Sequence, residues 1–354
     1  MPAPGSLQRS NTLGDISLLY VAVIARAVDA HDLDSGPLLA QFGIEPQLLA
    51  VPDARISIPR FMRLGHAATA LTGNPALGLT MGQLTRPVDA GRAGLAAQTA
   101  AVAGEALATQ IRYDLLTSQN SRGQPRMLTE PAAAEFYSIK PYNAFNHFVV
   151  DSVLAAWTQL LRTVTGQQQV LARVSIEYPD RGVAEAFEHW FGCPVVFGAG
   201  HNRIYPRPEV MRMACRDAQP AVHRQLREDC EQALARLRSG WGVRDQVREK
   251  LTPLLEGEAP RLEQVAMELG ITPWSLQRRL TEAGTGFREL VDRTRQDLAL
   301  DYIRETRLAF SEIAWLLGFS GPAAFHKAYQ RWFGRSPGQH RRAFSEEQKA
   351  KGIA

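Results

Sequence analysis

The sequence predicts two folding units of different class: an α/β or α+β unit at the N-terminus, and an all-α unit with two tandem helix-turn-helix units at the C-terminus. The length of 354 residues supports this division, because a single domain has about 150 residues. Over roughly the first 205 residues, some segments alternate apolar and polar residues and others have helical spacing, whereas the spacing after about residue 241 is helical throughout. The same pattern of helix, tight turn and helix then occurs twice.

The N-terminal unit, which we place at 13–207, follows a polar stretch, 1–12, that we expect to be a disordered tail. Apolar residues at three- and four-residue steps predict helices near 14–31, 37–42, 59–71, 92–101, 104–118, 143–164 and 183–191. Alternating or β-branched segments predict strands at 135–140, 170–178, 193–197 and 202–205. The order of these strands in a sheet does not follow from the sequence.

A polar segment with helical spacing connects the two units. We place this connecting helix and linker at 208–242, where Ser239-Gly240-Trp241-Gly242 ends the helix. The all-α unit then covers 243–344, and a tail covers 345–354. The connecting helix has an apolar stripe that either packs on its own domain or forms a dimer seam: Val222, Leu226, Cys230, Leu234 and Leu237.

Residues 261–283 predict the first helix-turn-helix unit. Gly270 suits a left-handed helix stop, Thr272 suits the N-cap of the next helix, and Pro273 suits the first position of that helix. Leu276 and Leu280 supply the inner face of the second helix. The outward side chains are of types that bond to phosphates and base edges: Trp274, Ser275, Gln277, Arg278 and Arg279.

The same plan recurs at 310–333, so the chain contains an internal repeat. Ile313-Ala314 and Leu317-Gly318 correspond to Val265-Ala266 and Leu269-Gly270. Ser320 is expected to cap the outer helix of this unit, and Pro322 to lie near its first turn. The buried stripe is predicted at Phe325, Tyr329 and Phe333, and the exposed side at Gly321, Ala323, Ala324, His326, Lys327, Gln330 and Arg331.

One helix, 287–305, is predicted between the two units. Its nineteen residues span about 28 Å at ~1.5 Å each. This length approaches the ~34 Å helical repeat of B-DNA. The two outer helices could therefore enter successive major grooves on one face of a duplex.

Positive charge is concentrated in the last third of the chain. The whole chain has a net charge of +4; residues 241–354 have 18 Lys+Arg and 15 Asp+Glu, against 22 and 21 in the rest. From Ile313 to Phe344 there is no carboxylate, which is typical of a phosphate-binding surface but also fits a solvated basic helix face. The basic residues of this stretch are Lys327, Arg331, Arg335, Arg341 and Arg342.

Several classes of protein are disfavoured by what the sequence lacks. Cys193, Cys215 and Cys230 have neither CxxC spacing nor an even count, so we expect no zinc site, no disulfide framework and no other metal or cofactor. The N-terminus has no basic region followed by an apolar core, and no stretch reaches the ~20 apolar residues that span a bilayer. We therefore expect a cytoplasmic protein with no membrane partner.

The two helix-turn-helix units resemble the AraC/XylS family of bacterial transcriptional regulators over roughly 245–344. The resemblance rests on the following residues of the second unit: Ile313-Ala314, Gly318-Phe319, Phe325, Tyr329, Phe333-Gly334, Ser336-Pro337 and Arg341. In the first unit it rests on Val265-Ala266, Leu269-Gly270, Leu276-Gln277-Arg278-Arg279-Leu280, Gly284, Phe287 and Arg295. Through Gly82-Gln83 and Phe145-Asn146-His147, the first 205 residues are similar to the arabinose-binding-type N-terminal domain of one branch of the family.

This resemblance implies a role for each unit. Trp274, Gln277 and Arg278 fall at positions that contact bases or backbone in the family, and Ala323, Ala324 and Lys327 at the corresponding places of the second recognition helix. The expected function is a transcriptional regulator, such as an activator, that binds double-stranded promoter DNA as a homodimer. A small-molecule effector of unknown identity and site is implied, and RNA polymerase is a further candidate partner.

Two other functions compete with this interpretation. An architectural DNA-binding protein would need no effector, but it would leave the N-terminal unit without a role beyond dimerisation. An enzyme or thiol sensor would need chemistry in the first 240 residues, where no P-loop, HExxH or GxSxG motif occurs. His147 is more readily explained as a core or surface histidine, and the three cysteines as small buried hydrophobic residues, so we expect no catalytic activity.

Overall fold

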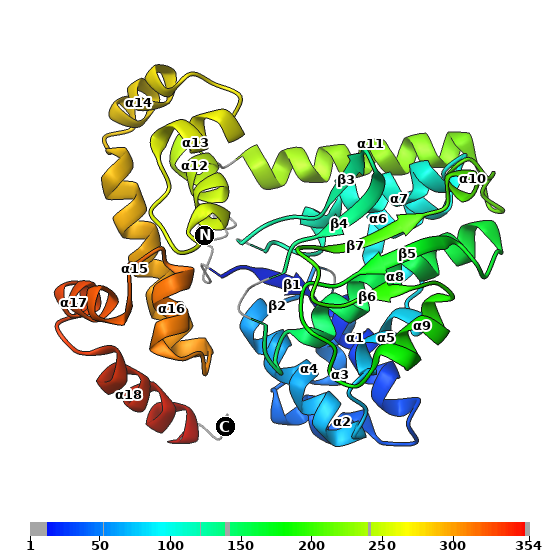
Figure 1. Ribbon diagram of the computed structural model, residues 1–354, viewed down its shortest axis with the longest axis horizontal. Helices are drawn as coiled ribbons and strands as arrows, with labels where there is room; N and C mark the ends of the chain where they lie inside the picture. The colour runs from blue at the N-terminus through cyan, green and yellow to red at the C-terminus, as the bar shows by residue number, and fades with distance from the viewer. Residues whose placement is uncertain (1–12, 52, 121, 139–141, 240–241, 351–354) are drawn as a thin grey trace, which may run out of the picture. The chain divides into compact units, whose positions relative to one another are not determined.

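The computed structural model describes residues 13–350 except 52, 121, 139–141 and 240–241, and it divides into two compact units (Figure 1). One unit comprises 15–120 and 124–237 and is called the N-terminal unit below. The other, the C-terminal unit, comprises 238–354 together with two short stretches, 1–14 and 121–123. The tail expected at 1–12 lies outside the described residues.

The N-terminal unit contains a mixed five-stranded sheet in the order β3-β4-β7-β5-β6. Neighbouring strands are antiparallel except β5 and β6, which are parallel. A separate antiparallel pair is formed by β1 (Asp15–Ser17) and β2 (Arg55–Ser57). The strands of the large sheet are β3 (Arg126–Thr129), β4 (Ala132–Phe136), β5 (Leu171–Ser175), β6 (Val195–Val196) and β7 (Asn202–Pro206).

Helices pack with these sheets and account for most of the N-terminal unit. They are α1 (Leu18–Asp29), α2 (Ser35–Gln41), α3 (Pro46–Leu49), α4 (Ile58–Thr72), α5 (Leu77–Leu84), α6 (Gly91–Gln98), α7 (Ala103–Arg112), α8 (His147–Thr165), α9 (Ala184–Phe191), α10 (Pro208–Met211) and α11 (Pro220–Ser239). Short 3₁₀ turns occur at Pro87–Ala90 and Asp114–Leu116. Mixed strands and helices in one unit confirm the predicted fold class.

Helices α5 and α8 cross closely because α5 has glycines on the shared face. A Cβ at Gly82 would lie 2.1 Å from the Ala155 Cβ, and one at Gly78 would lie 2.4 Å from the Asp151 Cβ. Real Cβ atoms do not approach so closely, so larger residues would force the two helices apart. The Gly82 of the sequence pattern thus has a packing role.

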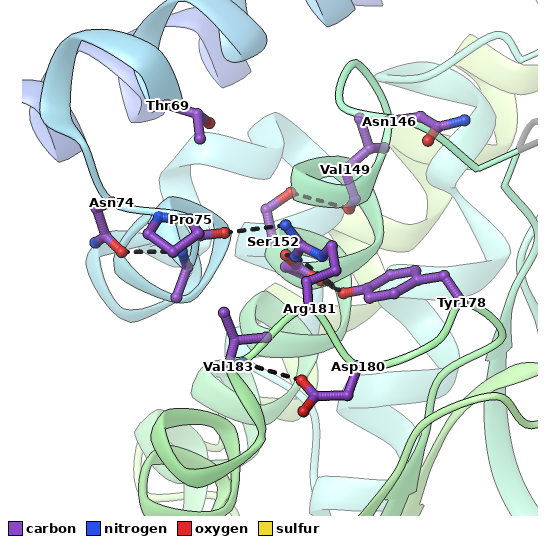
Figure 2. Close-up of polar contacts among 12 residues, drawn as sticks. Thr69, Asn74, Pro75, Asn146, Val149, Ser152, Tyr178, Asp180, Arg181 and Val183 are labelled. Carbon is purple, nitrogen blue, oxygen red and sulfur yellow. Dashed lines mark hydrogen bonds and ion pairs between the residues drawn. The ribbon is translucent and has the colours of Figure 1, made fainter.

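A buried ion pair joins α8 to the loop after β5. Arg181 donates a hydrogen bond of 3.0 Å to the fully buried Asp151 carboxylate, which also accepts one from the Tyr178 hydroxyl. Figure 2 shows the Arg181 guanidinium also turned toward the Pro75 carbonyl, to which it donates at 3.3 Å. Because the Asp151 carboxylate is paired with both Arg181 and Tyr178, this network holds α8, the β5–α9 loop and the segment before α5 together.

The C-terminal unit is all-α and contains both predicted helix-turn-helix units. Its helices are α12 (Val243–Leu251), α13 (Leu262–Glu268), α14 (Pro273–Glu282), α15 (Phe287–Glu305), α16 (Phe310–Leu316), α17 (Pro322–Phe333) and α18 (Pro337–Ala350), with a 3₁₀ turn at Thr252–Leu254. The predicted inner residues of both units share one core with α15: Val265, Ala266, Leu276, Leu280, Ile313, Ala314, Phe325, Tyr329, Leu298 and Tyr302.

Two residues from distant parts of the chain complete this unit. Leu13 is 1% exposed and belongs to the same core. Arg122 is 0% exposed, and its guanidinium donates to the carbonyl oxygens of Thr252 at 2.9 Å and Leu316 at 3.0 Å. Burying a guanidinium is tolerated only with such partners, so Arg122 fixes the end of α16 to the 3₁₀ turn after α12.

Some element boundaries differ from the expectation. The helix predicted at 14–31 begins only at Leu18, after strand β1, because the Ser17 side chain caps it. The connecting helix is interrupted after α10 and resumes at Pro220. Strands β1, β2 and β3 and helix α5 were not predicted. No helix in the described part of the chain is long and apolar enough to cross a membrane.

Candidate nucleic-acid interface

The first helix-turn-helix unit has the turn that the sequence predicts. Gly270 is left-handed, with φ of +65°, and follows Leu269, the C-cap residue of α13. The Thr272 Oγ1 accepts a hydrogen bond of 3.2 Å from the Ser275 backbone N–H, so Thr272 is the N-cap of α14. Leu276 and Leu280 are buried, as predicted. The turn and cap therefore fix which face of α14 meets solvent.

The outer face of α14 is broad and basic. Trp274 is 69% exposed, and Gln277, Arg278 and Arg279 are exposed beside it. Ser275 is half-buried, and its hydroxyl accepts a hydrogen bond of 2.9 Å from the Thr272 hydroxyl. Four of the five predicted residues thus face solvent, whereas Ser275 belongs to the N-terminal cap.

Arg278 is oriented by its neighbours on the helix. Its guanidinium lies 5.2 Å from the centre of the Trp274 ring, and its Nε lies 3.5 Å from the Glu282 carboxylate one turn later. Both side chains of this ion pair are well exposed, so its contribution to stability is small. The guanidinium is therefore positioned yet available to a phosphate or a guanine edge.

The turn of the second unit is held by α15. Arg295 donates to the carbonyl oxygens of Leu317 at 2.7 Å and Gly318 at 2.6 Å, and it lies 4.7 Å from the centre of the Phe319 ring. Gly318 is left-handed, with φ of +65°, and a Cβ there would lie 2.1 Å from the Glu258 carbonyl oxygen. This turn requires glycine for both its conformation and its close contact.

The predicted cap of the second outer helix is wrong. Gly321, not Ser320, is the N-cap residue of α17, and no side chain makes the cap hydrogen bond. The reason is the position of the helix start, because Pro322 is the first helical residue and the residue before it lacks a side chain. The leading turn of α17 thus has neither a capping hydroxyl nor a hydrogen-bonding side chain at Ala323 or Ala324.

The outer face of α17 differs from that of α14. Ala323, Lys327, Gln330 and Arg331 are exposed, whereas Ala324 and His326 are half-buried. The His326 ring stands edge-on to Phe310, with centres 5.2 Å apart. Among the described residues, no carboxylate lies within 4 Å of Lys327, so its charge is the one most available to an anion on this helix.

Sequence reasoning missed one residue that contacts this outer helix. Asp292 of α15 accepts hydrogen bonds from the Arg331 guanidinium at 2.9 Å and from the Trp332 indole at 3.1 Å. The stretch from Ile313 to Phe344 contains no carboxylate of its own, but the Asp292 carboxylate lies beside it in the fold. A second basic residue of the stretch, Arg341, is half-buried against the Phe310 ring, whereas Arg335 and Arg342 are exposed.

The two outer helices precede and follow α15 in the sequence. Figure 1 shows α14 beside the start of α15. The end of α17 contacts α15 at Asp292, and the turn before α17 contacts it at Arg295. The observed α15 runs from Phe287 to Glu305, with the predicted bounds. It lies between the two helix-turn-helix units in the sequence, and the length of its nineteen residues approaches one turn of a duplex.

The three cysteines and His147 are the residues on which a thiol sensor or an enzyme would depend. Burial raises the pKa of each of the Cys193, Cys215 and Cys230 thiols to about 11, which disfavours the reactive thiolate. His147 lies between the Tyr142 and Tyr178 rings, and burial, with Arg181 nearby, lowers its pKa to about 4. The described residues contain no group of three or more potential metal ligands.

Comparison with known families agrees with this geometry. Residues 33–214 match the family model of the arabinose-binding domain of the AraC transcription regulator, N-terminal, and residues 265–343 match a helix-turn-helix domain model. The two matches cover both units of the structure. The chain belongs to the AraC family of DNA-binding transcriptional regulators.

Named transcriptional regulators match this chain over most of their length and of its own. The chain is 28% identical to the ornithine utilization regulator of Pseudomonas aeruginosa over 93% of this chain and 96% of that protein. It is also 28% identical to the transcriptional regulator VirS of Mycobacterium tuberculosis, over 87% and 91%. A crystal structure of the regulator CdpR from Pseudomonas aeruginosa matches 90% of this chain and 97% of that chain, with 26% identity and a TM-score of 0.40.

Proposed function

We propose that the protein is a sequence-specific regulator that inserts α14 and α17 into two successive major grooves of promoter DNA, under the control of a small-molecule effector. The observation that carries this proposal is the pair of outer helices with exposed polar faces, one before and one after α15 in the sequence. Each belongs to a helix-turn-helix unit whose inner face is buried in one common core. A common core would keep the two helices at a constant spacing on the duplex.

The two helices have different tasks in this proposal. On α14, Gln277 and Arg278 have side chains that can bond to base edges in two places at once, so α14 supplies most of the sequence recognition. On α17, Ala323 and Ala324 offer only methyl contacts, such as those made with thymine. Lys327 then contributes chiefly by neutralising a phosphate. Ser275, Arg279, His326 and Arg331 complete the proposed surface.

Effector control is supported by a cavity in the N-terminal unit. The cavity has a volume of about 110 Å³ and is lined mainly by apolar side chains of α1, α5 and α8. Enclosed apolar pockets with a few polar groups are typical small-molecule sites. The family model that matches this unit is named for a ligand-binding domain. We propose that ligand binding here alters DNA binding or RNA polymerase recruitment.

We also propose that the protein acts as a homodimer, through the N-terminal unit, and that it has no catalytic activity. The exposed face of α11 includes Val222, which is 47% exposed, whereas Cys230 and Leu234 are buried within the protomer. Only part of the apolar stripe is therefore available to a second copy. Sedimentation of the full chain over a range of concentrations tests the dimer.

Competition binding tests the proposed function. The full chain is mixed with a labelled duplex from the region upstream of its own gene, and unlabelled duplexes of the same or shuffled sequence compete at fixed salt. We expect the native sequence to compete at least a hundredfold better than the shuffled one, since specific binding exceeds non-specific binding by ~10³-fold or more. Equal competition by both duplexes would indicate an architectural DNA-binding protein instead.

A further inference from the structure

The cavity of the N-terminal unit is apolar on most sides but contains one acidic group. Helix α8 contributes Val149, Val153 and Trp157 to its wall, and α5 contributes Met81. The 3₁₀ turn after α7 contributes Asp114, the only carboxylate among the described residues that line the cavity. Buried Gln110, at the end of α7, lies in the same wall.

The Asp114 carboxylate has no partner in this wall. Among the described residues, no donor lies within hydrogen-bonding distance of its side-chain oxygens. Arg55, the cation that acts on it electrostatically, is bound to the Asp15 carboxylate and donates to the Leu116 and Thr117 carbonyl oxygens at 3.0 and 3.2 Å. The Asp114 side chain is half-buried. A carboxylate that is held partly out of water without a partner costs free energy, which a ligand could recover.

The other polar groups of the cavity are already engaged or exposed. The Tyr20 hydroxyl is hydrogen-bonded to the Thr117 hydroxyl at 3.1 Å, and the Ser152 hydroxyl donates to the Val149 carbonyl at 3.0 Å. Arg86 also lines the cavity, but its side chain is 61% exposed and lies 3.3 Å from Asp89. Solvent and Asp89 therefore screen the charge of Arg86.

From this arrangement we infer that the cavity binds a small amine whose ammonium group pairs with Asp114 and whose apolar body packs against α8. The inference rests on the proposed effector function and names the chemical class of the effector. The volume of about 110 Å³ is of the same order as the ~150 Å³ of an apolar cavity that binds benzene, so it matches a single ring or a short alkyl chain. An ammonium donates up to three hydrogen bonds, for which the Asp114 oxygens and the Gln110 amide oxygen are acceptors.

Calorimetric titration of the full chain with three matched probes tests this inference. Benzylamine, benzyl alcohol and benzoate have the same ring and differ in the charge of the head group. At pH 8, above the pKa of about 7 to which burial raises the Asp114 carboxyl, we expect benzylamine to bind at least tenfold more tightly than benzyl alcohol. We expect benzoate to bind most weakly of the three.

Three variants locate the site. Asp114→Asn should remove the preference for benzylamine over benzyl alcohol while benzyl alcohol still binds. Ala156→Phe, which fills the cavity from α8, should abolish binding of both probes, with circular dichroism as the check of folding. Asp217→Asn is the matched control, because Asp217 is exposed and does not line the cavity, and it should leave all three affinities unchanged.

Two results would overturn the inference. The first is that the wild-type chain binds benzyl alcohol or benzoate as tightly as benzylamine or more tightly, or binds none of the three probes. The other is an unchanged preference for benzylamine in Asp114→Asn. The titrations contain no DNA, so either result leaves the proposed DNA-binding function untouched as long as the chain still selects its promoter duplex in the competition assay. Loss of promoter selectivity would instead refute the proposed function.

Discussion

Arg331 of α17 donates two hydrogen bonds to the Asp292 carboxylate of α15, at 2.9 and 3.2 Å, although the residues are 39 positions apart in sequence. The adjacent Trp332 indole donates to the same carboxylate at 3.1 Å. Asp292 thereby joins the end of the second outer helix to the helix between the two units. It also partly neutralises a cation of the proposed DNA surface.

This ion pair predicts that two cations of α17 contribute unequally to DNA binding. Lys327→Ala should reduce the slope of log affinity against log salt concentration by about 0.9, since one phosphate contact is lost. Arg331→Ala should reduce it by less than half as much, because the Arg331 charge is already paired on the protein. Binding titrations at four salt concentrations measure both slopes, and equal reductions would show that Arg331 leaves Asp292 on DNA.

Arg278 is predicted to determine sequence preference rather than charge alone. Arg278→Lys keeps the positive charge but loses the fork that bonds to both acceptors of a guanine edge. We expect it to weaken binding to the promoter duplex by ~1–3 kcal/mol and to leave the salt slope unchanged. Arg212→Ala, an exposed cation of the N-terminal unit, is the control. A uniform loss on promoter and shuffled duplexes would make Arg278 a phosphate contact.

The two turn glycines predict different costs of substitution. Gly270→Ala places a side chain in open space and should cost about 1–2 kcal/mol for its left-handed conformation. Gly318→Ala has the same conformational cost and in addition forces a Cβ against the Glu258 carbonyl oxygen. Denaturant unfolding of the full chain, followed by tryptophan fluorescence, should show the larger loss for Gly318→Ala. Equal losses would contradict the close contact.

The Asp114 carboxyl predicts a pH dependence of stability. Burial raises its pKa from 3.8 to about 7, with Arg55 opposing the shift; Tyr20 is the other titratable group that interacts with it. The folded chain therefore holds a proton that the unfolded chain releases between about pH 4 and 7, so stability falls as pH rises through this window. The Asp114→Asn variant has no titrating carboxyl at this position, so this contribution to the pH dependence of stability is absent.

The midpoint of thermal unfolding of Asp114→Asn should consequently rise relative to wild type between pH 5 and pH 8. The buried Asp151, whose pKa is also raised to about 7 by burial, is present in both proteins and does not affect the difference. Asp217→Asn is again the control, with no expected change in the difference. A constant difference for Asp114→Asn would show that its carboxyl has an ordinary pKa.

The local features of the DNA-binding unit could be predicted from the sequence. The Thr272 cap, the left-handed Gly270 and the bounds of α15 depend on neighbouring residues, and all three are observed. The contacts of Asp292, Arg122 and Arg295 could not be predicted, because apolar spacing shows which face of a helix is buried but not which helix packs against it. The prediction that Ser320 caps α17 was wrong for a local reason, since the helix begins one residue later than expected and Gly321 is its N-cap.

The N-terminal unit was less predictable. Strands β1 and β2 have three residues each, which is too short for an alternating pattern to be recognised. Helix α5 contains Gly78 and Gly82, which lower helix propensity but permit the close approach to α8. Asp114 could not be singled out from the sequence either, because its significance lies in the distant side chains that enclose it.

Selection of binding sites from a randomised duplex library by the full chain tests the central claim most directly. If α14 and α17 enter successive major grooves, the enriched duplexes should contain two sequence blocks about 10–11 base pairs apart, centre to centre. The block bound by α14 should be the more strongly defined, and Arg278→Lys should blur that block alone. A library that shows no enriched sequence, or a single block with no second one a helical turn away, would contradict the account.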